Sequence, residues 1–556
     1  MSRRRFDYAV PERWRADVRP GARVRVPFHG RRVGAWVVEC GVTPPPGVEV
    51  REVTGVSGFG PPPAVLELAE WAAWRWAMPV ATLLRTASPP RNVWALPARS
   101  APRGHADRAR AWEGDDGAAP PGVTLRRLAP AQDPLGVVLE AAAAADAAGL
   151  PALVLAPSTG WAERLAARLR ARGLDVASSW AEAAAGWPVV VGSRAAAWAP
   201  VPALGAAVVL DAHDYHDRYD AAEVVAARAS RDSAPCTLVS PCPTAVQRVR
   251  YGPAVAPERS AERSGWPALS VVDRRGADPR TGILSEELVH VARGVLERGG
   301  RLVCVLNRTG RARLLACAAC GALARCEVCG RAVESTDDVL RCRGCGASRP
   351  VVCAQCGSVR MKVLRQGVGR VREELEALLG VPVAEVSGRP GDEPVPDADV
   401  LVGTEAVLHR VRRAAAVAFL DFDQHLLAPR FVAGEEALSM LVRAGRLVGG
   451  RESAARHDPG VVLVQTRLPG HEVLAAAVAG DPDLFTELAL RRELRLPPYS
   501  ALATVKSESR PVLGTDAVEV SPLAPARWLL RAPDHRTLCD AVAPLHGGVG
   551  VDPVDV

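Results

Sequence analysis

The chain has 556 residues, of which 48% are hydrophobic, and a formal net charge of +7. This hydrophobic fraction excludes a fully disordered chain, and the length favours three to five domains over a single core. Residues 1–10 contain no apolar stretch and no long uncharged apolar run follows. We therefore expect neither a signal peptide nor a membrane span, and a cytoplasmic protein.

The first part of the chain is basic and rich in predicted strands. Residues 1–100 hold fifteen arginines and eight acidic residues, so they carry the whole net charge. Alternating apolar residues over 6–56, separated by Gly and Pro turns, predict a small β-barrel or sandwich, and a helix is expected over 64–84. The charge favours a polyanionic partner such as nucleic acid, and a solvated arginine-rich surface is the alternative.

Residues 96–124 lack periodicity and are expected to form a linker. Beyond them short apolar strands alternate with helices, which is typical of parallel sheets covered by helices on both faces. A first α/β unit starts near 125 and a second near 280, and a small α+β region covers about 471–556. The expected helices are 135–148, 161–172, 221–230, 284–298, 369–379, 435–448 and 483–494, and the expected strands are 152–155, 189–191, 207–210, 237–239, 302–306, 400–402, 416–420, 461–465, 501–506 and 528–532.

Eight of the thirteen cysteines lie within residues 317–356 as four CxxC pairs. The pairs are Cys317/Cys320, Cys326/Cys329, Cys342/Cys345 and Cys353/Cys356. Each pair can present two sulfurs to one metal, so four pairs predict two tetrahedral zinc sites with four thiolates each. Because four thiolates leave no open position for water, the zinc is expected to be structural.

Three pairings of the four knuckles are possible. We favour the nested one, in which the inner pairs bind one zinc and the outer pairs bind the other, because both ends of the segment then return to one place. Disulfides or buried structural thiols are the alternative, and the density of CxxC pairs weighs against them. Thioredoxin-type redox chemistry would need one CxxC on a βαβ unit.

Two α/β lobes with this insertion resemble the primosomal replication-restart protein family PriA, superfamily 2 helicases, over almost the whole chain. The resemblance is most specific in "CVLNRTGRARLLACAACG" and "QGVGRVREELEALLG", and it includes "FDYAVP", "PGARVRVPFHGRRVGAWVVE", "ALVLAPS", "VVLDAHD", "VAFLDFDQHLLAPR", "ELRLPPYSALATV" and "GVGVDPVDV". In that family nested zinc pairing is the rule.

The resemblance implies a multidomain α/β fold with a β-rich DNA-binding domain, two RecA-like lobes, an inserted two-zinc module and a small α+β C-terminal domain. It also implies a winged-helix domain before the first lobe, which we predict is missing because only about thirty residues remain there. The implied division is 1–95 for the 3′-DNA-binding domain, 96–124 for the linker, 125–255 for lobe 1, 256–312 and 361–470 for lobe 2, 313–360 for the zinc module and 471–556 for the C-terminal domain.

The nucleotide motifs of this family are degenerate here. A phosphate loop, GxxxxGK[ST], is expected before helix 135–148, but Ala129–Pro134 contains no glycine and no lysine. Asp211 of the second motif remains, and the glutamate that should follow is Ala212. The arginines of "LVRAGRLVGGR" lack the glutamine and spacing of motif VI. We therefore expect an actinobacterial-type member without ATPase or helicase activity, and the family cofactors ATP and Mg²⁺ are not supported.

The family captures the 3′ end of the nascent leading strand in a pocket of its N-terminal domain. The matching positions are Phe6, Asp7, His29, where the family has glycine, and Arg51. Asp7 could accept a hydrogen bond from a terminal 3′-OH, Arg51 could pair with a phosphate, and Phe6 could stack on a base or belong to the core.

The sequence thus predicts a non-motor replication-restart protein in the nucleoid, with two Zn²⁺ as cofactors. It would bind forked and single-stranded DNA and assemble with primosome proteins, the replicative helicase or its loader, and single-stranded DNA-binding protein. Two alternatives remain open. One is an ATP-dependent 3′–5′ DNA helicase with a divergent nucleotide site, and the other is a zinc-scaffolded interaction module that does not bind DNA.

Overall fold

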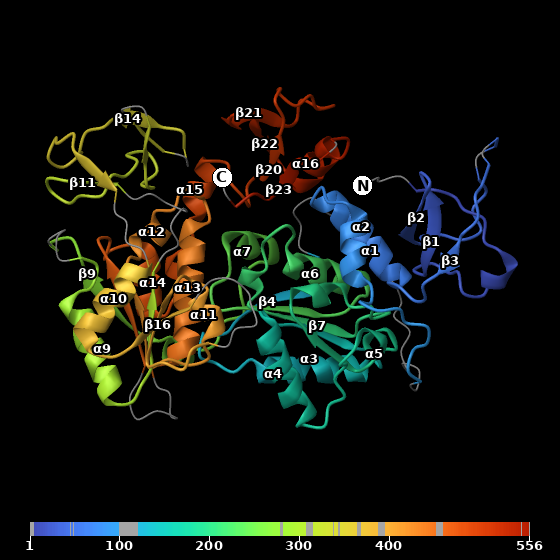
Figure 1. Cartoon of the computed structure of the whole chain (residues 1–556), viewed down its shortest axis with the longest axis horizontal. Helices are drawn as coiled ribbons and strands as arrows, with labels where there is room; N and C mark the ends of the chain where they lie inside the picture. The colour runs from blue at the N-terminus through green and yellow to red at the C-terminus, as the bar shows by residue number, and fades with distance from the viewer. Residues whose placement is uncertain are drawn as a thin grey trace.

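The computed structural model describes residues 5–44, 46–47, 49–98, 120–277, 282–306, 315–336, 339–342, 345–363, 368–386, 395–451, 460–545 and 547–554. Most of the expected linker and both junctions of the cysteine-rich insertion therefore lie outside the described residues. Figure 1 shows the N-terminal sheet at one end, two α/β lobes side by side, and the cysteine-rich module and C-terminal domain above them. Among the described residues, no helix combines the length and the hydropathy that a membrane crossing needs.

The N-terminal region contains one antiparallel sheet in the order β2-β1-β3, rather than the expected barrel or sandwich. Its strands are β1 (Arg23–Phe28), β2 (Arg31–Trp36) and β3 (Gly55–Val56), preceded by the short helix η1 (Glu12–Trp14). The expected helix over 64–84 is also wrong as one element. It is broken into α1 (Pro63–Arg75) and α2 (Val80–Ala87), because Ala77 adopts a left-handed φ of 50° just before Pro79, whose ring disfavours continuation of the preceding turn.

Lobe 1 is built on a parallel sheet in the order β4-β8-β7-β5-β6. Val154 and Val208 point to one face, where α3 and α4 cover them, whereas Leu153 and Val209 point to the other face, against α6 and α1. The elements are β4 (Val123–Arg127), α3 (Leu135–Ala147), β5 (Ala152–Leu155), α4 (Thr159–Arg170), α5 (Trp180–Ala184), β6 (Val189–Gly192), η2 (Arg194–Trp198), β7 (Ala206–Leu210), η3 (Ala212–Asp214), α6 (Ala221–Arg231), β8 (Cys236–Ser240), α7 (Ala245–Tyr251) and α8 (Arg259–Gly265).

Lobe 2 has a parallel sheet in the order β16-β17-β10-β18-β19-β9. It begins at β9, which lies within the implied range 256–312 and before the α/β pattern expected near 280, and α14 packs in its core beyond the expected boundary at 470. The elements are β9 (Ala268–Asp273), α9 (Glu286–Glu297), β10 (Leu302–Val305), α10 (Val368–Leu379), β16 (Val383–Val386), β17 (Val400–Gly403), α11 (Val407–Arg410), β18 (Ala416–Phe419), α12 (Asp423–Leu426), α13 (Ala433–Val448), β19 (Val461–Thr466) and α14 (Glu472–Ala479).

The cysteine-rich module is inserted between β10 and α10 of lobe 2. It contains a two-stranded sheet, β11 (Leu315–Cys317) with β15 (Met361–Val363), and a three-stranded sheet of β12 (Glu334–Thr336), β13 (Val339–Arg341) and β14 (Ser348–Pro350). Because β11 and β15 pair at the two ends of the insertion, the chain enters and leaves the module at one place. The amide of Ala332 donates to the carbonyl of Leu427 at 3.0 Å, which attaches the module to lobe 2.

The C-terminal domain is an antiparallel sheet in the order β21-β22-β20-β23 with one helix. Its strands are β20 (Ala501–Lys506), β21 (Glu519–Ala524), β22 (Arg527–Ala532) and β23 (Val549–Val551), and its helix is α16 (His535–Val542). The prediction of one continuous helix over 483–494 is wrong. The chain forms η4 (Pro482–Leu484) and α15 (Leu488–Glu493), separated by a bend in which Glu487 has a φ of 48°.

Helix α1, lobe 1 and the C-terminal domain share one hydrophobic core. Leu68 and Ala72 of α1, Val225 of α6 and Leu538 of α16 all belong to the same buried cluster. The indole nitrogen of Trp74 also donates to Asp540 at 2.8 Å. The helices α1 and α2 are therefore part of the body of the protein, and the N-terminal sheet projects from it (Figure 1).

Candidate nucleic-acid interface, metal centres and interlobe site

Two of the four residues proposed for DNA binding, Phe6 and His29, lie at the turn between β1 and β2 of the N-terminal sheet. The ring of Phe6 packs edge-on to Phe28 with centroids 5.1 Å apart, and Phe28 contacts the His29 ring at 4.4 Å. Phe6 is 51% exposed, so its outer face is open to a base. The core reading of Phe6 is therefore not supported, and an aromatic platform is available for stacking.

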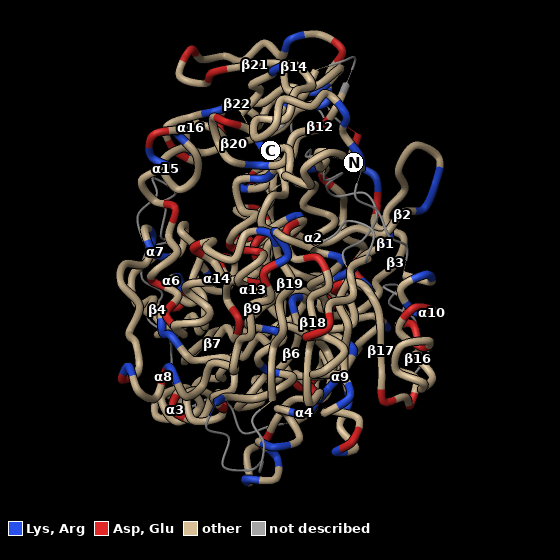
Figure 2. Tube along the Cα trace, turned by 90° about the vertical axis from the view of Figure 1, so that its left-hand side faces the viewer, with Lys and Arg blue, Asp and Glu red and all other residues tan. Residues whose placement is uncertain are grey.

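His29 adopts a φ of 45° and Gly30 follows with 74°. Two successive positive φ values define a two-residue hairpin turn of the type that suits the twist of antiparallel strands. This backbone explains why glycine is the expected residue at position 29. Arg31 and Arg32 lie directly after the turn, at the start of β2. Figure 2 shows a basic stretch of chain beside the label of β2.

The backbone brings Asp7 and Arg51 to the same edge of this sheet. The amide of Ala9 donates to the carbonyl of Arg51 at 2.9 Å, and the amide of Val53 donates back to Ala9 at 3.0 Å. Asp7 and Arg51 are both exposed. The arrangement thus presents an aromatic ring and a carboxylate from one segment, residues 6–7, and a guanidinium from the segment beside it.

The eight cysteine sulfurs of the inserted module form two groups of four. Cys317, Cys320, Cys353 and Cys356 make one group, and Cys326, Cys329, Cys342 and Cys345 make the other, with all sulfurs of a group within 4.8 Å of one another. This is the nested combination. The closest sulfurs are 3.4 to 3.6 Å apart, and none forms a disulfide. Each group can therefore hold a metal ion between two knuckles.

A glycine follows every CxxC pair, which is a local signal that the spacing analysis did not use. Gly321, Gly330, Gly346 and Gly357 have φ values between 71° and 76°. Each donates its amide to the carbonyl of the first cysteine of its pair, at 2.9 to 3.0 Å. The tight turn aims further amides at sulfur, as in the 3.4 Å contact from Ala319 to Cys317 Sγ. Hydrogen bonds from backbone amides, that of Cys320 first, lower the pKa of Cys317 to about 6 and favour the thiolate.

The loop expected to cradle phosphate, residues 129–134, is occupied by protein contacts. Three of its four amides have acceptors: Ala129 donates to Gln132 Oε1 at 2.9 Å, Ala131 to Gly265 O at 3.0 Å and Gln132 to Ala129 O at 3.0 Å. The amide of Leu135, just after the loop, donates to Asp133 Oδ1 at 3.1 Å. Pro130 and Pro134 have no amide hydrogen. Ala129 is buried, and a Cβ on Gly265 of α8 would lie only 2.6 Å from its own Cβ. Helix α8 therefore fills the space beside the loop.

Asp211, the remaining carboxylate of the second motif, is bound by an arginine of lobe 2. It is 4% exposed and lies directly after β7, and both of its oxygens accept hydrogen bonds from the guanidinium of Arg446 on α13. Arg446 also donates to Pro130 O at 3.3 Å and lies 4.8 Å from the ring centroid of Trp161. The guanidinium thus stands between the expected phosphate loop and the expected magnesium ligand.

A second pair lies one turn away on the same helix. Arg443 donates to Asp214, which follows β7 by four residues. Beside it, His213 Nδ1 contacts Ser240 Oγ at 2.9 Å, and burial lowers the pKa of His213 to about 4, so the ring is neutral at pH 7. The third arginine of this segment, Arg451, donates to the carbonyl oxygens of Pro267 and Val478. From the sequence alone, these three arginines were recognised only as part of a degenerate motif VI.

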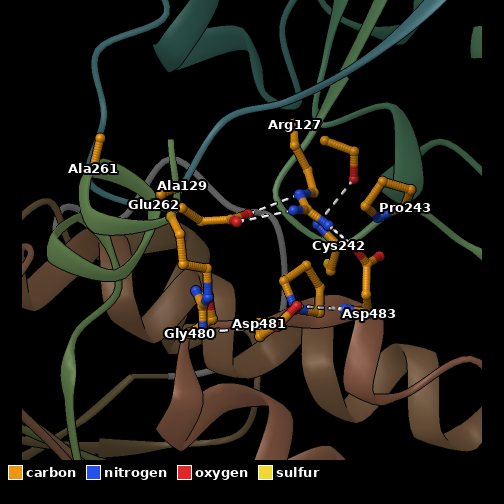
Figure 3. A network of polar contacts seen from close by, with 12 residues as sticks. Arg127, Ala129, Cys242, Pro243, Ala261, Glu262, Gly480, Asp481 and Asp483 are labelled. Atoms are coloured by element: carbon orange, nitrogen blue, oxygen red, sulfur yellow. Dashed lines mark hydrogen bonds and ion pairs between the residues drawn. The ribbon is translucent and has the colours of Figure 1, made fainter. Parts of the chain in front are cut away.

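A further polar network joins β4 of lobe 1 to the segment that follows α14. Arg127 pairs with Glu262 of α8 at 2.8 Å and also contacts Asp483 of η4, which in turn pairs with Arg248 of α7 (Figure 3). Arg259 donates to Gly480 O at 2.7 Å. A cavity of about 650 Å³ lies nearby between the two lobes and the C-terminal domain.

The two parallel sheets meet through residues at the carboxyl ends of β4 and β7 and through α13, and a metal-binding module is inserted in the second. This layout defines a two-lobed α/β protein with a cysteine-rich insertion. Residues 2–89 match the family model of the 3′ DNA-binding domain (3′BD) of PriA. The chain is 30% identical to the probable replication restart protein PriA of Mycobacterium leprae over 90% of this chain and 85% of that protein. It belongs to the PriA family.

Other relatives match over shorter parts. The replication restart protein PriA of Bacillus subtilis is 29% identical over 57% of this chain and 43% of its own length. That of Haemophilus influenzae is 27% identical over 65% of this chain and 55% of its own length. The chain thus spans about half the length of these two relatives.

Proposed function

We propose that this chain is a replication-restart protein that binds stalled or abandoned forks and promotes primosome assembly and helicase reloading without acting as a motor. The observation that carries the proposal is the pairing of Asp211 with Arg446. A carboxylate that already accepts two hydrogen bonds from a guanidinium has no free oxygen for a hydrated magnesium ion. The occupied amides of residues 129–134 support the same conclusion.

DNA binding is assigned to the N-terminal domain. The exposed Phe6 platform would stack on the terminal base, Asp7 would accept a hydrogen bond from the 3′-OH, and Arg51 would contact a phosphate. His29 narrows the space beside Phe28, so we expect weaker preference for the end than for the backbone. Forked and single-stranded DNA are the proposed ligands, and primosome proteins, the replicative helicase or its loader, and single-stranded DNA-binding protein are the proposed partners in the nucleoid.

The metal proposed for both four-cysteine groups is zinc. Four thiolates within one tetrahedral reach fit Zn²⁺, which supplies a rigid cross-link there and no open coordination position. The module would then serve as a platform for partners. We retain the division into N-terminal domain, lobe 1, lobe 2, module and C-terminal domain as part of the proposal, with the end of lobe 2 moved past α14.

The test is a fork-binding titration with a nascent leading strand ending at the junction. Binding should weaken steeply with salt, and Arg51→Ala should reduce the salt slope by about 1. Arg510→Ala, which removes an exposed arginine of the C-terminal domain, is the matched control and should leave the slope unchanged. A flat salt dependence would favour the interaction module that does not bind DNA.

ATP turnover is measured on the same forks. We expect no turnover above that of Asp211→Ala. Turnover that fork DNA stimulates and that Asp211→Ala abolishes would contradict the proposal and establish the helicase alternative.

A further inference from the structure

Helix α13 crosses from the core of lobe 2 to the polar ends of the strands of lobe 1. Arg443 and Arg446 lie three residues apart on it, so they share one face, and each pairs with a carboxylate that follows β7. Both carboxylates come from lobe 1 and both arginines from lobe 2. The two pairs therefore join the lobes and do not stabilise either one internally.

The same helix contacts lobe 1 at its other end. Glu435, in the first turn of α13, accepts a hydrogen bond from the amide of Ala245 at the start of α7, at 2.5 Å. Its other oxygen pairs with Arg491 of α15 at 3.0 Å, and Arg491 is 1% exposed. Glu435 of lobe 2 thus contacts both lobe 1 and the segment that leads to the C-terminal domain.

Close backbone packing accompanies these charges along α13. A Cβ on Gly445 would lie 2.9 Å from Pro267 and 3.3 Å from Pro130 of the expected phosphate loop. The backbone of α13 thus packs directly against Pro267 and Pro130 at this point. The contacts extend over three turns of the helix, from residue 435 to residue 446, and they combine two ion pairs, a capped helix start and apolar packing.

In an enzyme whose lobes open and close, a bound ligand supplies the charge that draws the two halves together. Here that charge is built into the chain. We propose that α13 is an intramolecular clasp: Arg443 and Arg446 take the place of a nucleotide and hold the two lobes in one closed arrangement. The inference deepens the proposed function, on which it rests, because a fixed frame lets the N-terminal sheet and the cysteine-rich module hold constant positions on a fork.

The experiment measures the distance between the lobes in the full chain. Spin labels on unnatural amino acids replace Arg164 of α4 and Glu373 of α10, both exposed, so that the cysteines are untouched. We expect one narrow distance distribution, unchanged by a non-hydrolysable ATP analogue with magnesium. The double variant Arg443→Gln/Arg446→Gln should lose the narrow distribution, and the charge swap Asp211→Arg/Arg446→Asp should largely restore it relative to Arg446→Asp alone.

Arg372→Gln is the matched control, since Arg372 pairs with Glu376 on the surface of α10 within lobe 2. It should leave the distribution narrow. A broad distribution in the unsubstituted protein, a narrowing caused by the ATP analogue, or a double variant as narrow as the control would overturn the clasp.

A second measurement needs no variant that must fold. The amide of Ala131, bound to Gly265 O beside Arg446, should exchange with solvent no faster than core amides of lobe 1 in the absence of nucleotide. The clasp would also be overturned if the Ala131 amide exchanged more than about tenfold faster than those core amides and the ATP analogue slowed that exchange. Fork binding and ATP turnover are measured in parallel. Loss of fork binding refutes the proposed function while leaving the distance result to decide the clasp.

Discussion

Replacing Arg75 by methionine should destabilise the junction of α1, lobe 1 and the C-terminal domain. Arg75 is 1% exposed, and its guanidinium lies 3.1 Å from Glu223 of α6 and 2.8 Å from Asp552 beyond β23. Methionine keeps the length of the apolar stem and removes the charge. Two carboxylates would then remain buried, with Arg250 and His535 as their remaining cations.

The magnitude follows from the burial of the pair. Removing one partner of a buried ion pair costs about 3–5 kcal/mol. The pKa of Glu223 supports the sign of the effect: burial raises it, but Arg250 and then Arg75 outweigh burial and lower it to about 2. Because Arg250 remains beside Glu223, we expect Arg75→Met to lower the free energy of unfolding by about 3 kcal/mol at pH 7, the lower end of that range.

Urea unfolding followed by tryptophan fluorescence measures this loss, since Trp76 lies 5.0 Å from the Arg75 guanidinium. Arg5→Met is the control. Arg5 pairs with Glu70 on the surface, where both side chains are at least 40% exposed, and such pairs contribute about 0–1 kcal/mol. Because the pKa of Glu223 is lowered in the folded state, its stabilisation is present above pH 4.5 and is lost as the pH falls toward 2. The difference in the free energy of unfolding between wild type and Arg75→Met should therefore become smaller over that pH range. A loss of stability at pH 7 no larger than that of Arg5→Met would refute the reasoning.

Three more outcomes are expected. Deleting residues 1–62 should leave a folded protein that loses fork binding. Deleting residues 1–95 also removes α1 from the shared core and should give an aggregated protein, as judged by circular dichroism and light scattering. Equal melting temperatures for the two deletion variants would contradict the shared core. Chelation should release two metals per chain and unfold the cysteine-rich module without shifting the melting of lobe 1, and a single cooperative collapse would argue against an inserted module. His29→Gly should raise stability by about 1 kcal/mol because it relieves the left-handed backbone, and a lower melting temperature would show that the ring contributes more than the strain costs.

Most strands of both lobes could be predicted because each is a short apolar run whose residues are buried on both faces of a sheet. β4, β9 and β16 were not expected, because polar or partly exposed residues interrupt that run. Val208 and Val209 point to opposite faces and are both fully buried, so the pattern needs no periodicity to be read. β21 was missed for the opposite reason. It is an edge strand with mostly exposed residues and includes Pro522, so nothing in its composition separates it from a loop.

The two misjudged helices share one cause, which is a left-handed residue inside an otherwise helical pattern. Ala77 and Glu487 both have positive φ and neither is a glycine. At the first break the apolar spacing continues because α1 and α2 bury residues in the same core. Pro79 marked the first break in the sequence, whereas no residue near Glu487 marked the second.

The metal centres could be read from the sequence because their ligands lie within forty residues and each knuckle is a local turn. The contacts of Asp211 could not, because its partner lies 235 residues further along the chain and belongs to another lobe. The sequence indicated what the nucleotide site had lost, namely a lysine, two glycines and a glutamate. It carried no indication that an arginine had taken the vacated space.

That replacement has a physical reason, which leads to the last prediction. A carboxylate that is 4% exposed cannot stay ionised without a cation, so if Asp211 holds no magnesium, as we propose, it must be either neutralised or paired. Arg446→Met should therefore cost about 3–5 kcal/mol, since it leaves Asp211 buried and alone. Adding Asp211→Asn to that variant should restore most of the loss, because replacing both partners of a buried pair is often close to neutral. The double-mutant cycle, measured by urea unfolding, isolates this coupling. If the two losses simply add, Arg446 contributes through its packing on Trp161 and not through the charge of Asp211.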